Sequence, residues 1–447
     1  MLPIFLLPAF LQLQVDPGPP ARSRPPNVLV LIADDVGWED LESVPMPQVD
    51  QLAARGLSFR GFHAMPLCAP TRVALWTGRW PRRMGVGDGV NSFAPPNPVG
   101  NPTPPSELVS LPKLLKQRGY RTCLVGKWHM GQASWVGSPN PEDIATGPHA
   151  HGFDHWLAGL PSNVNQGGSG YEDWFRVDDG DFTQNETDYA TRAMRDAAVQ
   201  WWTSTDGPKF LAVSLPAAHV PFHVPPPDMI PLWNPLVPIQ SNTEMYQAMI
   251  QTVDTVLGDL LLHVGADDWV FFLSDNGTPS NVNGNRNTGK NTTYRRGVEV
   301  PLIVAGPGVR TLGEEVQALV SCADLYATIA AIAGTTPPGA STGLGGEDSV
   351  SFAGAFEQGR AWRGAREWVF GERFNLPGTL REEDIMVRTE RWKLRIVRDP
   401  RPPDEEFLYD LLRDPDELFP LLEGDLNPDQ REAYERLQRI LARLPPR

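Results

Sequence analysis

The sequence predicts an α/β fold in which a mostly parallel central sheet is sandwiched between helices, followed by a small C-terminal antiparallel-sheet subdomain. Two observations lead to this prediction. Short, continuous apolar runs alternate with amphipathic helical segments over roughly the first 350 residues, as in sheets that are covered on both faces. After about Gly346, the runs become shorter, partly alternating and separated by charged turns, which is typical of antiparallel strands.

The strands expected to be buried share an apolar, β-branched composition. They cover residues 27–33, 121–126, 209–215, 268–274 and 300–306. The helices expected between them repeat apolar residues every three to four positions. They cover residues 46–56, 110–119, 188–202 and 244–264. The C-terminal strands are expected at 366–373, 384–390, 391–398 and 406–411, before a terminal helix over 428–444.

We therefore expect three segments. Residues 1–25 are an export signal or a disordered N-terminal segment, because "MLPIFLLPAFLQLQV" is apolar but lacks a basic start and a clear cleavage site. This run is too short to span a bilayer, and no later segment is predicted to be transmembrane. We expect residues 26–355 to form the large α/β domain and residues 356–447 to form the C-terminal subdomain. Export to the periplasm or exterior is the predicted localisation, with the cytoplasm as the alternative.

Composition and charge exclude some partners. The 447 residues are 41% hydrophobic and carry a net charge of −15. A strongly acidic chain lacks the basic face that nucleic acids or acidic membranes require. A local basic pocket for a small anion remains compatible with this charge. Three cysteines are too few for a disulfide framework, and Cys123 and Cys322 lie in apolar runs that predict buried, inert thiols.

Polar side chains follow four of the predicted strands. Since ligands of open α/β sheets bind beyond the carboxyl ends of the strands, we expect these side chains to meet there. They are Asp34, Asp35, Lys127, His129, His219, Asp275 and Asn276. An aspartate pair after a strand is also a common helix cap, which is the alternative for Asp34 and Asp35 taken alone.

The chemistry of these side chains indicates a metal-assisted anion site. Carboxylate and amide oxygens suit Ca²⁺ or Mg²⁺ rather than zinc. Basic side chains accompany them: Arg72, Lys127, His129, His219 and Lys290. A divalent cation ringed by cationic side chains suits an oxyanion, either sulfate or phosphate.

The segment "LCAPTRVALWTG" places a cysteine at the start of a helix. Pro70 is expected at the first helical position, with the helix continuing over residues 71–78. Cys68 would then lie at the helix N-terminus, where negative charge is favoured. A capping cysteine, or a thiol whose pKa is lowered there, is the alternative interpretation.

The sequence resembles the sulfatase family of the alkaline phosphatase superfamily. The resemblance rests on "CAPTR" with "LWTGRWPRRMGV", and on "ADDVGWEDL", "LLKQRGYRTCLVGKWHMG", "AAHVPFH", "SDNGT" and "TGKNTTYRRGVEVPLIVAGPG" in the family order. Glu39 departs from the glycine that is common in the "GWGDL" version of the second motif. This change in a turn is not expected to affect the ligands.

The resemblance implies a sulfuric ester hydrolase with an alkaline phosphatase-like fold. Cys68 would be oxidised to Cα-formylglycine by a separate maturation enzyme. The metal ion, most often Ca²⁺ in this family, would be bound by Asp34, Asp35, Asp275, Asn276 and the modified residue 68. Arg72 and His129 would orient the aldehyde hydrate, and Lys127 and Lys290 would bind the sulfate oxygens. His219, alone or together with Lys290, would protonate the leaving alcohol, a role that suits the near-neutral pKa of histidine. His223 is either a further substrate contact or an ordinary loop histidine.

The resemblance also explains why a cysteine precursor is needed. A thiol attacking sulfate would leave a stable thiosulfate ester, whereas a hydrate offers one hydroxyl to attack and a second to release the product. The substrate would be a sugar, aryl or alkyl sulfate, selected by loops near 87–107, 131–149 and 157–190 and by the C-terminal subdomain. Two alternatives stay open: a phosphate or phosphonate ester hydrolase of the same superfamily, and a non-catalytic binder of sulfate esters.

Overall fold

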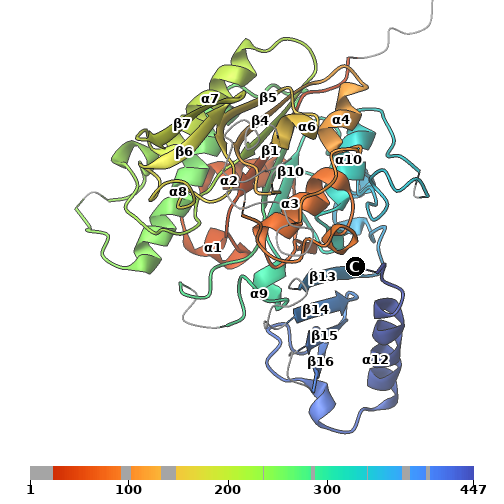
Figure 1. The fold of residues 1–447 in the computed structure, drawn as a ribbon. Coiled ribbons are helices and arrows are strands. Elements are labelled where there is room, and N and C mark those ends of the chain that lie inside the picture. Colours follow the sequence, from red (N-terminus) through yellow and green to blue (C-terminus); the bar gives the residue numbers. More distant parts are fainter. Residues whose placement is uncertain are drawn as a thin grey trace, which may run out of the picture.

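The fold consists of a large α/β body and a small sheet-and-helix unit beside it (Figure 1). A computed structural model describes residues 24–91, 102–131, 147–234, 236–282, 287–339, 341–374, 383–398 and 403–446. The predicted export segment lies almost entirely outside these residues. In the described chain, no helix combines the length and the apolar character needed to cross a bilayer.

The central sheet has ten strands in the order β11-β2-β10-β9-β1-β8-β4-β5-β6-β7. Its middle strands, β9, β1, β8, β4 and β5, are parallel to one another. In chain order the strands are β1 (Val28–Ala33), β2 (Leu57–Phe59), β4 (Arg121–Lys127), β5 (His155–Leu160), β6 (Trp174–Asp178), β7 (Asp181–Glu186), β8 (Lys209–Ser214), β9 (Trp269–Ser274), β10 (Leu302–Ala305) and β11 (Glu314–Val316).

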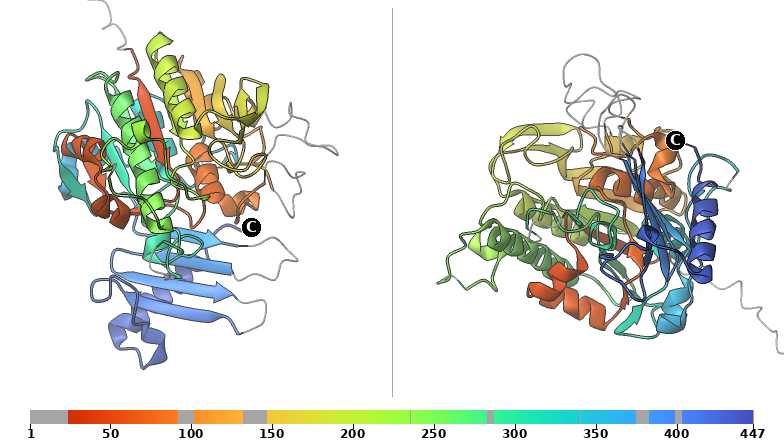
Figure 2. Two further views of the ribbon diagram at one scale, coloured as in Figure 1. Left: turned by 90° about the vertical axis from the view of Figure 1, so that its left-hand side faces the viewer. Right: turned by 90° about the horizontal axis from the view of Figure 1, so that it is seen from below.

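Helices cover both faces of this sheet (Figures 1 and 2). Alternate residues of β1 point to opposite faces, so Val28, Val30 and Ile32 join one apolar core while Leu29, Leu31 and Ala33 join the other. The first core contains residues of α3 (Cys68–Thr77), α4 (Leu111–Lys116) and α10 (Asp324–Ile332). The second contains residues of α2 (Pro47–Ala54), α7 (Ala190–Ser204) and α8 (Asn242–Leu261). The predicted fold class is confirmed.

The C-terminal unit is an antiparallel sheet with one helix. Its strands are β13 (Val369–Arg373), β14 (Glu383–Arg388), β15 (Trp392–Arg398) and β16 (Glu405–Asp410). Helix α12 (Pro428–Leu441) begins at a capping box formed by Asn427 and Gln430, and it buries Ala433 and Leu437. The remaining elements are short: α1 (Trp38–Ser43), β3 (Phe62–His63), η1 (Pro81–Met84), α6 (Gly147–Ala150), η2 (Pro227–Met229), α9 (Arg295–Val298), β12 (Val320–Ser321), α11 (Gly354–Gln358), η3 (Gly359–Ala361) and η4 (Leu421–Glu423).

The structure differs from the expectations in three places. Residues 157–190 are not mainly a loop, because β5, β6 and β7 extend the sheet there through antiparallel pairs. Strand β10 is antiparallel to β9, although its apolar composition gives no hint of its direction. Helix α3 begins at Cys68, so that Pro70 is its third residue instead of its first. Much of the two other expected specificity loops, residues 92–101 and 132–146, lies outside the described residues.

Candidate active site

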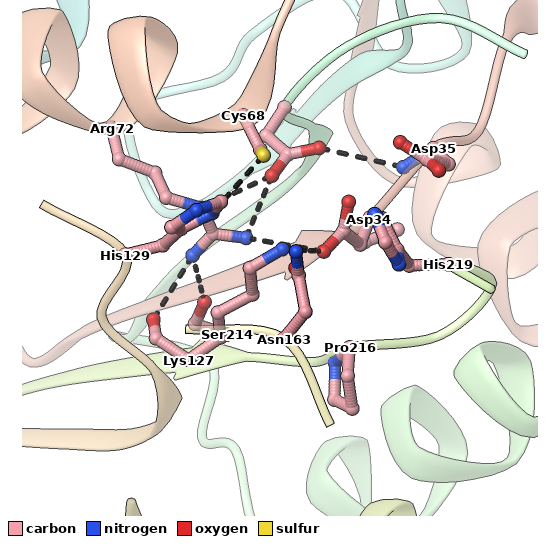
Figure 3. Close-up of polar contacts among 12 residues, drawn as sticks. Asp34, Asp35, Cys68, Arg72, Lys127, His129, Asn163, Ser214, Pro216 and His219 are labelled. Atoms are coloured by element: carbon pink, nitrogen blue, oxygen red, sulfur yellow. Dashed lines mark hydrogen bonds and ion pairs between the residues drawn. The ribbon is translucent and has the colours of Figure 1, made fainter. Parts of the chain in front are cut away.

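The functional side chains predicted after separate strands meet at one edge of the central sheet (Figure 3). Asp34 and Asp35 follow β1, Asp275 and Asn276 follow β9, and Lys127 is the last residue of β4. His219 lies five residues beyond β8. Because β9, β1, β8 and β4 are adjacent and parallel, their carboxyl ends bring these residues into one cluster.

Buried oxygen atoms in this cluster fit a hard divalent cation. One ligand atom each from Asp34, Asp275 and Cys68 lie within 4.8 Å of one another, and a second such group contains Asp34, Asp35 and His219. Asp34 Oδ1 and Asn276 Oδ1 are buried without a hydrogen-bond partner. Buried polar atoms normally have hydrogen-bond partners, so two unpaired oxygens beside buried carboxylates indicate a binding site for a cation.

The charges of the carboxylates give the same indication. Burial raises the pKa of Asp35 to about 7, and the neighbouring Asp34 and Asp275 add to this shift while Lys290 opposes it. Burial and Asp34 also raise the pKa of Asp275. For Asp34, burial acts upward, but Lys127 and other nearby cations lower its pKa overall. Three carboxylates this close repel one another, and a divalent cation would relieve that repulsion.

Three cationic side chains are paired with these carboxylates. Lys127 Nζ bonds to Asp34 Oδ2, and Lys290 Nζ lies 2.5 Å from Asp35 Oδ1. Arg72 is fully buried and donates from Nε and Nη2 to Asp275 Oδ2 at 3.0 and 2.7 Å. Its Nη1 donates to the Lys127 carbonyl oxygen and to Ser214 Oγ. The guanidinium therefore braces Asp275, whereas the sequence expectation had it bonding to residue 68.

Cys68 lies at the first position of α3 and is almost fully buried. Burial raises the pKa of its thiol, despite opposing effects of Lys127 and Lys290, and this direction does not support the alternative of a thiol with a lowered pKa. The alternative of a capping cysteine is also wrong, because Leu67 is the N-cap residue.

His129 is positioned to accept a proton from residue 68. Its Nε2 lies 2.8 Å from the carbonyl oxygen of Val90, which can only accept, so Nε2 carries the hydrogen. Nδ1 then presents its lone pair to Cys68 Sγ at 3.1 Å. Burial, with Lys127 and Arg72 nearby, holds the pKa of His129 well below its usual value, so the ring is neutral.

The environments of His219 and His223 differ from those expected from the sequence. Burial and then Lys290 lower the pKa of His219 to about 3, so the ring is neutral instead of near its midpoint at pH 7. Its Nδ1 donates to the Val220 carbonyl at 2.8 Å, which leaves Nε2 unprotonated. His223 bonds to the Pro221 carbonyl and to Tyr189 Oη, and its ring packs against Tyr171. These contacts assign His223 a structural place and do not support the predicted substrate contact.

Supporting residues were not anticipated. Tyr246 Oη lies 2.7 Å from both the Asp35 carbonyl oxygen and Asp40 Oδ2, and Asp40 also accepts from Thr278 Oγ1 and the Gly37 amide. This network holds the left-handed backbone at Asp35, whose φ is 66°. The signal in the sequence was weak, because Asp40 directly follows Glu39 in "GWEDL" and resembles an ordinary acidic residue at the start of a helix.

Asn163 was also missed. It follows β5, its Oδ1 is buried without a partner, and its side chain points into the group of residues drawn in Figure 3. The sequence signal was weak, because Asn163 lies in a polar segment that reads as an ordinary loop.

Comparisons with known proteins agree with this geometry. The family model described as Sulfatase matches residues 26–335. Human N-acetylgalactosamine-6-sulfatase is 32% identical over 364 residues, covering 72% of this chain and 64% of that protein. Human arylsulfatase A is 30% identical over 474 residues, covering 95% of this chain and 89% of that protein.

Solved structures share the fold. The structure of Ps i-CgsB in complex with k-i-k-neocarrahexaose has a TM-score of 0.72 at 24% identity and covers 93% of both chains. The PsFucS1 sulfatase from Pseudoalteromonas sp. has a TM-score of 0.71 at 22% identity, covering 94% of this chain and 90% of that one. With the family match over most of its length and the site residues gathered at one sheet edge, this chain belongs to the sulfatase family.

Proposed function

We propose that this protein hydrolyses sulfate monoesters of a sugar, aryl or alkyl alcohol, using formylglycine formed from Cys68 as the nucleophile. The observation that carries the proposal is the place of Cys68, which is buried at the start of α3 between His129 and the carboxylate cluster. A neutral, buried thiol is poorly suited to act itself, and a modified residue at the same point would lie between an oxyanion site and a base.

A Ca²⁺ ion, or Mg²⁺, would be held by Asp34, Asp35, Asp275, Asn276 and residue 68. When bound, the ion would lower the pKa of the attacking hydroxyl and neutralise charge on the sulfuryl oxygens. The unpaired oxygens of Asp34 and Asn276 support this ligand set.

The cationic side chains would bind the sulfate. Lys127 and Lys290 have carboxylate partners in the protein alone, and sulfate oxygens would give their ammonium groups a second anionic partner. Arg72 would keep Asp275 in place from behind. We assign His129 the role of accepting the proton of residue 68 at Nδ1, since that lone pair already faces the residue.

His219 would donate the proton to the leaving alcohol from Nε2. Because burial and Lys290 lower its pKa to about 3 in the protein alone, protonation near neutral pH would require the negative charge of a bound sulfate ester to raise that pKa. The role therefore depends on substrate binding, which distinguishes it from a histidine that is charged beforehand.

The names of two relatives support a proposal for the substrate class. N-acetylgalactosamine-6-sulfatase and arylsulfatase A carry names that point to a sulfated sugar and an aryl sulfate. We propose a member of one of these classes as the substrate. We also propose that the protein is exported and that a maturation enzyme is its partner. Its chain would divide into a catalytic domain over 26–355 and a subdomain over 356–447.

The phosphoesterase alternative has less support. Among the described residues, both metal-binding groups share Asp34, so they form one centre instead of the two that a two-metal phosphomonoesterase needs. A panel of matched sulfate and phosphate esters compares the two activities directly.

The test of the mechanism couples mass spectrometry to activity. Protein made with and without a maturation enzyme is digested, and the peptide containing residues 67–72 is weighed while activity is measured on sulfated sugars and nitrophenyl sulfate. Activity should follow the fraction of aldehyde, and Cys68→Ala should fold but lose activity by a factor of about 10⁴ or more. Fully active protein with an unmodified Cys68 would refute the proposal.

A further inference from the structure

The turn that carries Lys290 is fixed to the catalytic domain on one side. The Lys290 amide donates to the Thr278 carbonyl at 2.9 Å, and the Asn291 amide donates to the Pro66 carbonyl at 3.0 Å. Pro66 lies two residues before Cys68. These bonds place the turn beside the nucleophile, and Lys290 Nζ reaches Asp35 from there.

The other side of the turn is held by the C-terminal sheet through Thr293. This residue is fully buried. Asp384 of β14 accepts from the Thr293 amide at 2.8 Å and from its Oγ1 at 2.6 Å. Lys393 of β15 donates to the Thr293 carbonyl oxygen at 2.6 Å. All three polar groups of one residue are therefore bonded to two charged side chains of the small sheet.

These two side chains are themselves held in place. Arg395 donates to both oxygens of Asp384 at 2.8 and 2.9 Å. Lys393 is paired at 2.6 Å with Glu417, which also accepts from the Arg295 amide at the start of α9. Figure 1 shows α9 next to this sheet. The four charged residues expose at most 8% of their surface.

Burying four charges is an expensive way to join two units. Well-packed apolar residues of similar volume would often be equally or more stabilising. The ionic arrangement has a specific geometry instead, because bidentate and charge-assisted hydrogen bonds are directional and fix the position of Thr293, which apolar contacts do not. Thr293 is three residues from Lys290, so its bonds restrict the position of the turn that carries Lys290.

We propose that the C-terminal sheet is a positioning element of the active site, in which Asp384 and Lys393 hold Thr293 so that Lys290 faces the sulfate. This inference rests on the proposed sulfate-binding role of Lys290. The hydrogen bonds described for Asp384, Lys393 and Thr293 do not reach Cys68 or the carboxylate cluster, so we class these three as positioning residues.

The first experiment is a double-mutant cycle with the matured, metal-loaded full chain. Asp384→Asn should lower kcat/KM for a sulfate ester by about 10- to 100-fold, since misplacements on the order of 1 Å cost factors of this size. On a Lys290→Ala background, the same change should cost less than about twofold, because the group that it positions is gone. Thr293→Val, which removes only the Oγ1 bond, should give a smaller loss with the same dependence on Lys290.

The matched control is Asp410→Asn in the same sheet. Asp410 pairs with Arg391 at 2.8 Å, and its bonds stay within the small sheet. This variant should change Tm but leave kcat/KM within about twofold. Equal losses for Asp384→Asn and Asp410→Asn, or an undiminished loss on the Lys290→Ala background, would overturn the inference.

The second experiment does not depend on activity. Hydrogen exchange of the peptide covering residues 287–299 should accelerate in Asp384→Asn and in Thr293→Val, and remain unchanged in Asp410→Asn. Unchanged exchange in both positioning variants would refute the proposal that Asp384 and Lys393 hold Thr293 in place, even if the enzyme is active. If the exchange accelerates but the wild-type protein cleaves no sulfate ester, the bonds of Asp384 and Lys393 still stabilise the turn. The proposed function and the positioning role for Lys290 then both fail.

Discussion

Acid should destabilise this protein through His151, a buried histidine behind the active site. Only 3% of His151 is exposed, and its ring packs on Trp128, which lies between Lys127 and His129. Burial, and then Lys113, lower the pKa of His151 to about 4 from the usual value near 6.5. His151 Nδ1 is buried without a hydrogen-bond partner, so the folded protein offers no acceptor for the proton that would charge the ring.

The magnitude follows from the difference between these pKa values. Below pH 6.5 the unfolded chain binds a proton at this position and the folded chain does not, so the free energy of unfolding falls as pH falls. The pKa difference is about 2.5, and at about 1.4 kcal/mol per unit the loss approaches 3 kcal/mol by pH 4. Above pH 6.5 the effect vanishes, because both states are neutral there.

The assay is urea unfolding of the wild type and of His151→Gln at pH 7, 6, 5 and 4. Glutamine does not titrate, so the gap between the two proteins should close, or reverse, as pH falls from 6.5 to 4. His149→Gln is the control, since His149 is partly exposed and lies in α6, two residues before His151. Parallel curves for the wild type and His151→Gln would refute the reasoning.

Three further predictions concern the metal, the acid and the core. Chelation should lower both activity and Tm, and Ca²⁺ should restore them by mass action, with Asp275→Ala behaving like the chelated protein; full activity in metal-free protein confirmed by elemental analysis would contradict the ligand set. His219→Ala should reduce hydrolysis of an alkyl or sugar sulfate by about 10²- to 10⁴-fold and of nitrophenyl sulfate much less, because a good leaving group needs no acid; equal losses would make His219 only a sulfate ligand. Trp76→Ala should lower the free energy of unfolding by about 3–5 kcal/mol in denaturant titrations, since Trp76 of α3 is buried with its ring edge-on to Phe153 and Phe210; a loss below 1 kcal/mol would show that this packing contributes little stability.

The cluster at the sheet edge was predictable from the sequence for a simple reason. Parallel strands end at the same edge, so side chains at or directly after the ends of β1, β4 and β9 must converge there, regardless of the loop structure. This argument fixes where Asp34, Lys127 and Asp275 lie. It does not reveal their partners, and the bond of Arg72 to Ser214 joins residues 142 positions apart.

The missed elements lacked the pattern on which sequence reasoning relies. Strand β7, "DFTQNE", is polar and almost fully exposed, so it has neither an apolar run nor alternation. The direction of β10 depends on its neighbours in the sheet, which composition does not record. His223 was ambiguous because a histidine near the site motif reads the same whether it faces substrate or packs on Tyr171 and Tyr189.

Strand β7 also bears on how molecules of this protein meet one another. A large open sheet ends in two rows of unpaired backbone groups, which invite a second chain to add a strand and start aggregation. Here one border, β11, lies against η3, where the Arg360 amide donates to Glu314. The other border is β7, a short strand with Asp181 at one end and Glu186 at the other. In a protein that already carries a net charge of −15, stacking two such borders would bring like charges together, so the sheet is protected from growing beyond its own chain.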